Sequence, residues 1–356
     1  MANLSRICSP DSWRYQRVTY SAHAAADPRG GVEVAAQKAV AGATLNTTDY
    51  ATTVHIVGPD VPRQKVGWWD SQASSPTTGK TTSSVGVVKL LERMAAVPIP
   101  ESFAPASGTD AQAVIWQPST DTVWELWRTR VNDPLVWNPK DPDLEPFESE
   151  AKNSPGDVWQ ITWGGRVDNV SANLSTGFRE ADPALNGSNY LHGTAASGLM
   201  QAPGLITPGE LSRGVIPKAP DISLIQVAKL TTTTTRDGLS WPGYRTDGGL
   251  VLAETSPYGG MVLREGQRLV MDRGVSTEGM HPVAATITTA LQTYGCVIRD
   301  RAGAVTLSGQ SAHQWTDRGQ VDPYAALFAG TPKYEVMNQV PWGSLRALPK
   351  DHGKPA

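Results

Sequence analysis

One segment constrains the fold of this chain more than any other part of its sequence: residues 108–130, which read GTDAQAVIWQPSTDTVWELWRTR. Two runs rich in β-branched and aromatic residues, 113–116 and 122–128, flank a polar run that contains proline, serine and aspartate. Such a polar run is typical of a turn between two paired strands. The segment therefore predicts a β-hairpin within a protein that is rich in strands.

The second strand of this hairpin carries polar and aromatic side chains on both faces. Because successive side chains of a strand point to opposite faces, Asp121, Glu125 and Trp127 share one face. Two interpretations are open: the strand is buried on both sides, with Glu125 paired to Arg128 or Arg130, or one face lines a ligand-binding groove that includes Trp127. The first is favoured, because a buried carboxylate is costly unless it is paired.

Turn-forming residues recur along the whole chain and predict a mainly β fold. With 34 glycines and 27 prolines in 356 residues, the composition suits many short strands joined by turns. Residues 296–307 predict a second hairpin, because two apolar runs flank the polar sequence Asp-Arg-Ala-Gly.

One clear helix is expected among these strands. Residues 282–294 place apolar side chains at helical spacing, and Gly295 is positioned to end the helix. A jelly-roll-like β-sandwich with this one packed helix fits the whole pattern. A β-propeller is the alternative fold, although no repeat of about 40–50 residues is visible.

Residues 1–90 differ in composition from the remainder and indicate a two-part organisation. Short strand-like pieces alternate there with Ala, Gly, Asp and Pro, and residues 72–84 are rich in Ser and Thr without apolar anchors. Such a stretch is typical of an exposed loop or linker. We therefore expect an N-terminal attachment or edge-strand region over residues 1–90 and a β-sandwich domain over residues 91–356.

Four blocks of sequence resemble a known family. They are GTDAQAVIWQPSTDTVWELWR (108–128), WQITWGGRVDNVS (159–171), GTAASGLMQAPGLITPGEL (193–211) and YGCVIRDRAG (294–303). The family comprises uncharacterised proteins of actinobacteria, many of them secreted, and chains of actinobacteriophages that are similar to minor tail proteins. The resemblance covers about residues 95–345. It implies a tail component of a virion and supplies no catalytic residues.

One departure from this family follows the third block. Many members carry a His-Ala-Leu-like strand there, whereas this chain has Lys218-Ala219-Pro220. An activity that depends on that histidine is therefore not expected here. Within the block, Thr207 and Glu210 follow the pattern of a capping box at the start of a short helix.

Charge and hydropathy exclude several classes of partner. The net charge is −3 and 18% of the residues are charged, without a dense Lys/Arg run, so nucleic-acid binding is not expected. The chain has no run of about 20 apolar residues, which argues against membrane insertion. Residues 1–20 lack the apolar core of a secretory signal. This favours a protein that is assembled in the host cytoplasm and resides in the virion tail.

The cysteines and histidines show no spacing typical of a metal site. Cys8 and Cys296 are the only cysteines, and the six histidines form no His-x-x-x-His motif. We predict no metal and no cofactor. A disulfide between the two cysteines is one interpretation, but the apolar strand around Cys296 favours a buried free thiol.

The aromatic-rich loop at residues 241–249, WPGYRTDGG, is the best candidate for a ligand-binding site. Trp241, Tyr244, Arg245 and Asp247 place two rings and two opposite charges in this short loop and could form a platform for a ligand. The alternative is an aromatic loop that closes one end of the sandwich.

Two classes of function fit these observations. The first is a non-enzymatic virion component, a minor tail or tail-tip protein that contacts host cell-wall polysaccharide and other tail proteins, and forms a homo-oligomer. The second is a glycan-cleaving enzyme, either a glycoside hydrolase or a depolymerase. Glu125 and Asp121 would then supply the two carboxyl groups, which hydrolysis requires about 5–9.5 Å apart. Four residues of strand span about 13 Å at the backbone, so this pair is a weak candidate.

Overall fold

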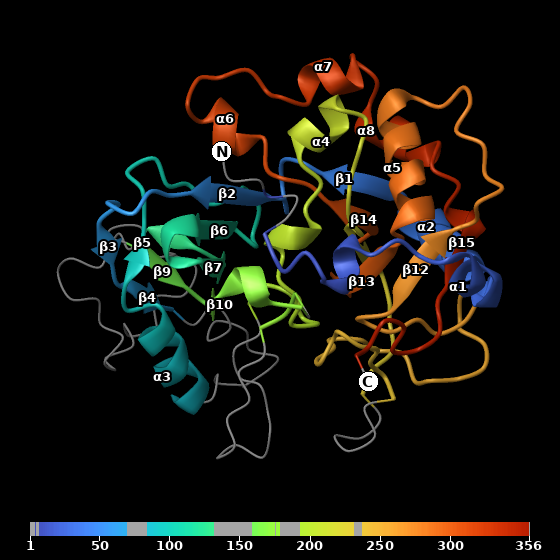
Figure 1. Cartoon of the computed structure of the whole chain (residues 1–356), viewed down its shortest axis with the longest axis horizontal. Coiled ribbons are helices and arrows are strands. Elements are labelled where there is room, and N and C mark those ends of the chain that lie inside the picture. The colour runs from blue at the N-terminus through green and yellow to red at the C-terminus, as the bar shows by residue number, and fades with distance from the viewer. Residues whose placement is uncertain are drawn as a thin grey trace, which may run out of the picture.

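The computed structural model describes residues 4, 7–69, 84–131, 159–174, 176–178, 193–230 and 237–355. Strands in these ranges form four sheets, of which one has six strands and another has four. Figure 1 shows the two large sheets beside each other, with helices packed around the six-stranded sheet. A bridge between Thr52 and Gln310 joins the four-stranded sheet to the end of the six-stranded one.

The elements have the following bounds. The strands are β1 (Ala43–Asn46), β2 (Thr52–Ile56), β3 (Arg63–Gln64), β4 (Val66–Trp68), β5 (Val97–Pro98), β6 (Gln112–Gln117), β7 (Thr122–Trp127), β8 (Arg130–Val131), β9 (Trp159–Ile161), β10 (Trp163–Asp168), β11 (Asp221–Leu224), β12 (Arg268–Met271), β13 (Cys296–Arg301), β14 (Val305–Ser308) and β15 (Leu345–Ala347). The α-helices are α1 (Tyr20–Ala25), α2 (Arg29–Ala41), α3 (Ser84–Arg93), α4 (Pro208–Ser212), α5 (Pro282–Thr293), α6 (His313–Thr316), α7 (Ala325–Phe328) and α8 (Lys333–Asn338). Short 3-10 turns are η2 (Trp13–Tyr15), η3 (Pro118–Thr120), η4 (Val170–Ala172), η6 (Ala202–Gly204) and η7 (Trp342–Ser344).

The six-stranded sheet has the order β1-β14-β11-β13-β12-β15 and contains both parallel and antiparallel pairs. Alternate residues of its strands point into one core, as the two-residue period of a strand requires, and α2, α5 and α8 contribute to the same core. The strand residues in this core are Ala43, Leu45, Ile222, Leu224, Leu269, Met271, Cys296, Ile298, Val305, Leu307, Leu345 and Ala347. Their burial stabilises this face of the sheet.

The predicted helix is confirmed as α5. His281 caps its first turn, because its ring nitrogen accepts a hydrogen bond from the Val283 amide at 3.2 Å. Gly295 follows the helix with φ of +69°, a left-handed conformation that favours glycine.

One of the strand-like pieces expected in residues 1–90, at residues 31–35, is wrong, because these residues lie in α2. Gly30 and Gly31 weaken the helical pattern of this segment. The structure explains both glycines by close packing. A Cβ at Gly31 would lie 2.3 Å from the carbonyl oxygens of Gly343 and Leu345, and a Cβ at Gly30 would lie 2.7 Å from the Ala347 amide. The glycines therefore allow α2 to lie directly against η7 and β15.

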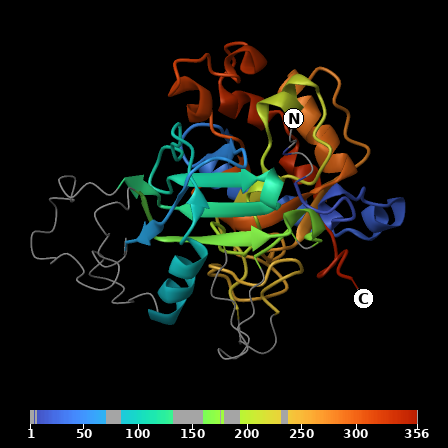
Figure 2. The same cartoon turned by 60° about the vertical axis from the view of Figure 1, so that its left-hand side comes forward.

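The predicted hairpin at residues 108–130 is confirmed as β6 and β7, which η3 joins. These strands form the centre of the four-stranded sheet, order β10-β7-β6-β2, which Figure 2 brings to the front. Both faces of β7 are buried: Trp124 and Leu126 enter one core, and Val123 enters another. Burial of this strand on both sides is therefore confirmed, but the expected pairing of Glu125 with Arg128 or Arg130 is wrong. Glu125 accepts hydrogen bonds from Thr194 and from two backbone amides, and Arg130 donates to Gln160.

The second predicted hairpin is wrong in its pairing. Strands β13 and β14 form where expected, but β11 lies between them, parallel to β13 and antiparallel to β14. The local sequence reveals both strands and their turn. It does not reveal that a strand from about 75 residues earlier enters the space between them.

A mainly β jelly roll is not confirmed. Helices and strands contribute about equally to the described residues, and the sheets are mixed. The short helices around the six-stranded sheet lack a strong helical pattern in the sequence, which is why we expected only one. No helix in the described ranges is long and apolar enough to cross a membrane.

The described part of residues 1–90 contributes to both large sheets. Strand β1 forms one edge of the six-stranded sheet, and β2 forms one edge of the four-stranded sheet. The side chain of Arg14 is fully buried and lies 2.8 Å from Asp221 of β11. Most of the predicted linker, at residues 72–83, lies outside the described residues.

Candidate functional site

Asp121, one of the two carboxylates considered for hydrolysis, stabilises a turn. It lies between η3 and β7 with φ of +51°. Its carboxylate accepts hydrogen bonds from the backbone amide of Ser171 at 3.1 Å and from the Ser171 hydroxyl at 2.6 Å. These contacts connect the hairpin to η4.

Glu125, the other candidate, is buried in the protein interior with its own set of donors. It accepts hydrogen bonds from the Thr194 hydroxyl at 3.1 Å and from the amides of Gln201 and Ala202 at 2.6 and 3.1 Å. Burial raises the pKa of Glu125 to about 7, although the two amides lower it. Because Glu125 is 0% exposed, these contacts support a structural role.

Trp127 also has local partners. Its indole N–H donates to Asp110 at 3.2 Å, and the guanidinium of Arg128 lies 4.7 Å from the ring centroid. These contacts hold the ring against the hairpin, and the loop at residues 241–249 contributes none of them.

The two rings of the predicted ligand platform are buried. Trp241 is 8% exposed and packs edge-on against Trp13, with ring centroids 6.0 Å apart. Tyr244 is 7% exposed and lies over Gly198, where a Cβ would come within 2.1 Å of the ring. Neither ring offers a free face to a ligand in this conformation. Their contacts with Trp13 and Gly198 instead hold the loop against the protein interior.

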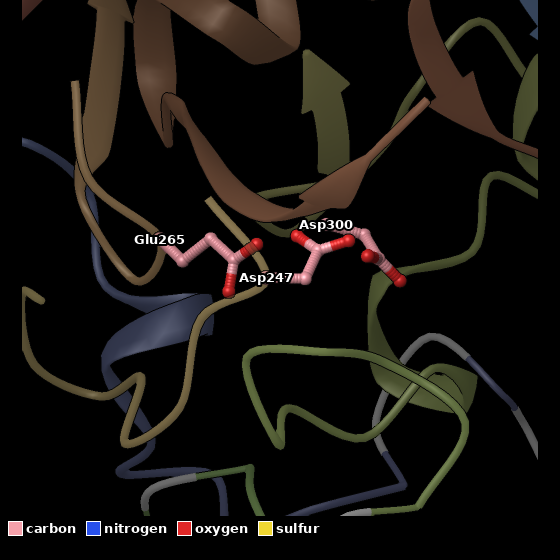
Figure 3. A group of neighbouring side chains, drawn as sticks. All are labelled: Asp247, Glu265 and Asp300. Carbon is pink, nitrogen blue, oxygen red and sulfur yellow. The ribbon is translucent and has the colours of Figure 1, made fainter. Parts of the chain in front are cut away.

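Asp247, from the same loop, belongs to a group of three neighbouring carboxylates. One carboxylate oxygen each from Asp247, Glu265 and Asp300 lies within 4.8 Å of the other two. Figure 3 shows these three side chains, which come from separate segments, lying next to one another with Asp247 in the middle. We call these three residues the acidic cluster. Asp247 is exposed, Asp300 is half-buried and Glu265 is fully buried.

Backbone contacts fix the position of Glu265. Its carbonyl accepts a hydrogen bond from the Ser240 amide at 3.0 Å, and the following amide, of Gly266, donates to the Ile298 carbonyl at 2.8 Å. Gly266 adopts φ of +81° at this point. The segment is thereby held between the aromatic loop and β13.

An irregularity in β13 directs Asp300. The register between β11 and β13 shifts after Ile222, so Arg299 has no partner position. A β-bulge of this kind re-aims side chains and is frequent beside functional sites. Beyond the bulge, the Asp300 carboxylate accepts a hydrogen bond from the Ala196 amide at 3.3 Å.

The acidic cluster shifts the protonation of its own members. Burial raises the pKa of Glu265 well above its usual range, and the negative charges of Asp300 and Asp247 raise it further. Arg245 acts in the opposite direction on Glu265. Burial also raises the pKa of Asp300 to about 6, although Arg299 lowers it. Burial and the like charges therefore disfavour simultaneous ionisation of all three carboxyl groups.

Part of this site was predictable from the sequence. The aromatic loop draws attention to Arg245 and Asp247, but Glu265 and Asp300 follow in separate segments, Asp300 at the start of the predicted turn. Their spacing matches no motif, because the fold alone brings them together.

Comparison of the chain with protein families, curated proteins and solved structures finds no match.

Lys218 lies beside the predicted capping box. The predicted capping box is confirmed: Thr207 and Glu210 exchange hydrogen bonds at the start of α4. Lys218 lies 3.0 Å from Glu210, and both side chains are fully buried. Lys218 therefore supplies the charge partner that a buried carboxylate requires.

The geometry at Gly266 gives a first testable result. A Cβ there would lie 1.8 Å from the Ser240 carbonyl oxygen, so we expect Gly266→Ala to lower the free energy of unfolding by at least about 2 kcal/mol. Urea unfolding followed by tryptophan fluorescence measures this loss. Gly259→Ala is the matched control, because its φ of +85° is similar but nothing lies within 4 Å of the added Cβ. Equal losses in the two variants would contradict the close approach at Gly266.

Proposed function

We propose that this chain is a minor tail or tail-tip component of an actinobacteriophage virion and that it contacts host cell-wall glycan at the acidic cluster. The four sequence blocks support the virion role. One observation carries the location of the contact: Asp247 is exposed in the same short loop as Arg245, directly beside two further carboxylates. In the same proposal, the chain forms a homo-oligomer and contacts other tail proteins.

The chemistry of these groups suits sugar hydroxyls. A carboxylate accepts hydrogen bonds and a guanidinium donates them, whereas a hydroxyl group does both. Hydrogen bonds to charged groups are also stronger than those between neutral groups. Because Trp241 and Tyr244 are buried, the proposed contact depends on polar groups rather than on stacking of a ring against the sugar.

A second function, glycan hydrolysis, is supported by one specific observation. The carboxylates of the acidic cluster lie within 4.8 Å of one another, close to the separation of about 5–5.5 Å that retaining glycosidases use. With a pKa of about 6, Asp300 is suited to donate a proton. In this alternative, Asp300 is the acid and Asp247 is the nucleophile, in place of Glu125 and Asp121.

Binding to arabinogalactan, a cell-wall polysaccharide of actinobacteria, tests the contact. We expect the purified full chain to be retained on the immobilised polymer, and Asp247→Asn to weaken this retention by about tenfold or more, since a charged hydrogen-bonding group is lost. Asp60→Asn is the matched control, because Asp60 is an exposed aspartate in the turn between β2 and β3. Equal retention of both variants would contradict a contact at the acidic cluster.

The same incubation separates binding from hydrolysis. Retention without release of reducing ends supports a non-enzymatic contact. Release that Asp300→Asn abolishes and Glu125→Gln preserves would establish hydrolysis at the acidic cluster. Release abolished by Glu125→Gln alone would assign the hydrolysis to β7. It would contradict both a non-enzymatic contact and hydrolysis at the acidic cluster.

A further inference from the structure

Among the polar groups of the described residues, the carboxylate of Glu265 stands out by its burial and its lack of hydrogen-bond donors. The residue is 0% exposed, and neither of its two oxygens has a hydrogen-bond partner within the described part of the chain. An unpaired buried carboxylate is strongly destabilising. Its close polar neighbour is the carboxyl group of Asp247, which can hydrogen-bond to Glu265 only when one of the two groups holds a proton. The position of Glu265 therefore suits a further partner that offers positive charge or a hydrogen-bond donor to its carboxylate.

By contrast, the other buried carboxylates among the described residues have donors or cations. Glu125 accepts hydrogen bonds from two backbone amides, Asp221 lies against Arg14, and Glu210 lies against Lys218. The fold thus satisfies buried acids elsewhere. At the acidic cluster it instead places three carboxylates side by side, with Asp247 between Glu265 and Asp300 (Figure 3).

The charges of the site also require compensation. When ionised, the three carboxylates carry three negative charges. Arg245 acts on Glu265, and Arg299, which also pairs with Asp221, acts on Asp300. The negative charges therefore exceed the nearby positive ones, and one divalent cation would offset the excess. Oxygens that lie within 4.8 Å of one another can share a single ion, because calcium–oxygen distances are about 2.3–2.6 Å.

We propose that Asp247, Glu265 and Asp300 bind one hard divalent cation, with Ca²⁺ as the best-fitting ion. All three residues offer oxygen ligands, which calcium and magnesium prefer over nitrogen or sulfur. Asp247 is exposed, so the remaining coordination positions open toward solvent. The cation satisfies the carboxylate of Glu265 and fixes the loop that carries Asp247. This site does not depend on glycan binding, because the ion itself is the ligand that is measured.

A shared proton between Glu265 and Asp247 is the competing explanation for the unpaired carboxylate. The two explanations differ in their response to metal. Binding of a cation displaces protons from carboxyl ligands, so the affinity for Ca²⁺ should rise from pH 5 to pH 8, and protons should be released into the buffer. A pair that only shares a proton shows neither effect.

Calorimetric titration of the chelator-treated full chain with CaCl₂, and separately with MgCl₂, tests the proposal. We expect one ion per chain, and we expect Glu265→Gln and Asp247→Asn each to weaken binding by at least about tenfold, the lower range for loss of groups that support a metal site. Glu125→Gln is the matched control for a buried glutamate, and Asp60→Asn is the control for an exposed aspartate. Both controls should bind as the wild type does.

A second measurement keeps the test decisive if one variant fails to fold. Because a ligand that binds only the folded state raises its stability, Ca²⁺ should raise the Tm of the wild type and of both controls. At the same Ca²⁺ concentration, it should raise the Tm of Asp247→Asn by less. The proposal is overturned if neither ion binds the wild type, or if Glu265→Gln and Asp247→Asn bind the ion as tightly as the controls.

Discussion

Asp221→Ala is expected to lower the free energy of unfolding by about 3–5 kcal/mol, because it leaves two arginines buried without their carboxylate. Asp221 lies at 2.8 Å from Arg14 and at 3.5 Å from Arg299, and its side chain and that of Arg14 are fully buried. The charge of Arg14 would remain in the interior with only neutral acceptors, such as the Ala219 carbonyl. Urea unfolding at pH 7, with an unchanged dependence on denaturant, measures the loss.

An exposed pair of hydrogen-bonded side chains provides the control for Asp221. Asp317 lies 3.0 Å from His313, and these side chains are 47% and 31% exposed. Because water already solvates such a pair, Asp317→Ala is expected to change stability by less than about 1 kcal/mol. A loss below 1 kcal/mol in Asp221→Ala would mean that the Arg14 contact does not hold the N-terminal segment to β11.

Glu125→Gln is expected to stabilise the protein at pH 8 and to reduce its dependence on pH. The pKa of Glu125 is raised from 4.5 to about 7 in the folded state, so the folded chain keeps a proton that the unfolded chain releases. Stability therefore falls as the pH rises from about 4.5 to about 7. At 1.36 kcal/mol per pKa unit, the fall due to this group is about 3 kcal/mol. Glutamine stays neutral at every pH, and its oxygen can accept the same two amides.

Urea midpoints at pH 5 and pH 8 measure this effect. The wild type should lose stability between the two values, and Glu125→Gln should lose about 3 kcal/mol less. Some dependence should remain in the variant, because the pKa values of Asp300 and Glu265 are also raised. An identical pH dependence in the two proteins would show that Glu125 is not the buried, partly protonated group that its contacts indicate.

Short-range patterns predicted the parts of this fold that depend on neighbours in the chain. The hairpin of β6 and β7, helix α5 and the capping box at Thr207 each depend on a few consecutive residues, and each is confirmed. Helix α2 was missed because its glycines serve packing against η7 rather than helix formation. The pairing of β13 was missed because its parallel neighbour, β11, lies far away in the sequence.

The candidate site was also predicted only in part. The composition of the aromatic loop indicated Asp247, since charged and aromatic residues concentrate there. Glu265 and Asp300 lie in separate segments, and they reach Asp247 through a bridge at Leu239 and a bulge in β13. Spacing in the sequence cannot reveal such a site. The buried state of Trp241 was equally hidden, because its neighbour Trp13 lies over 200 residues away.

Hydrogen exchange of the full chain, with and without arabinogalactan, tests most directly whether the acidic cluster is the functional site. The account predicts slower exchange in peptides that cover residues 239–250 when the polysaccharide is present, and unchanged exchange in peptides from β6 and β7. The protection should be lost in Asp247→Asn and retained in Asp60→Asn. Protection of the β6–β7 hairpin with no change at residues 239–250 would contradict the account.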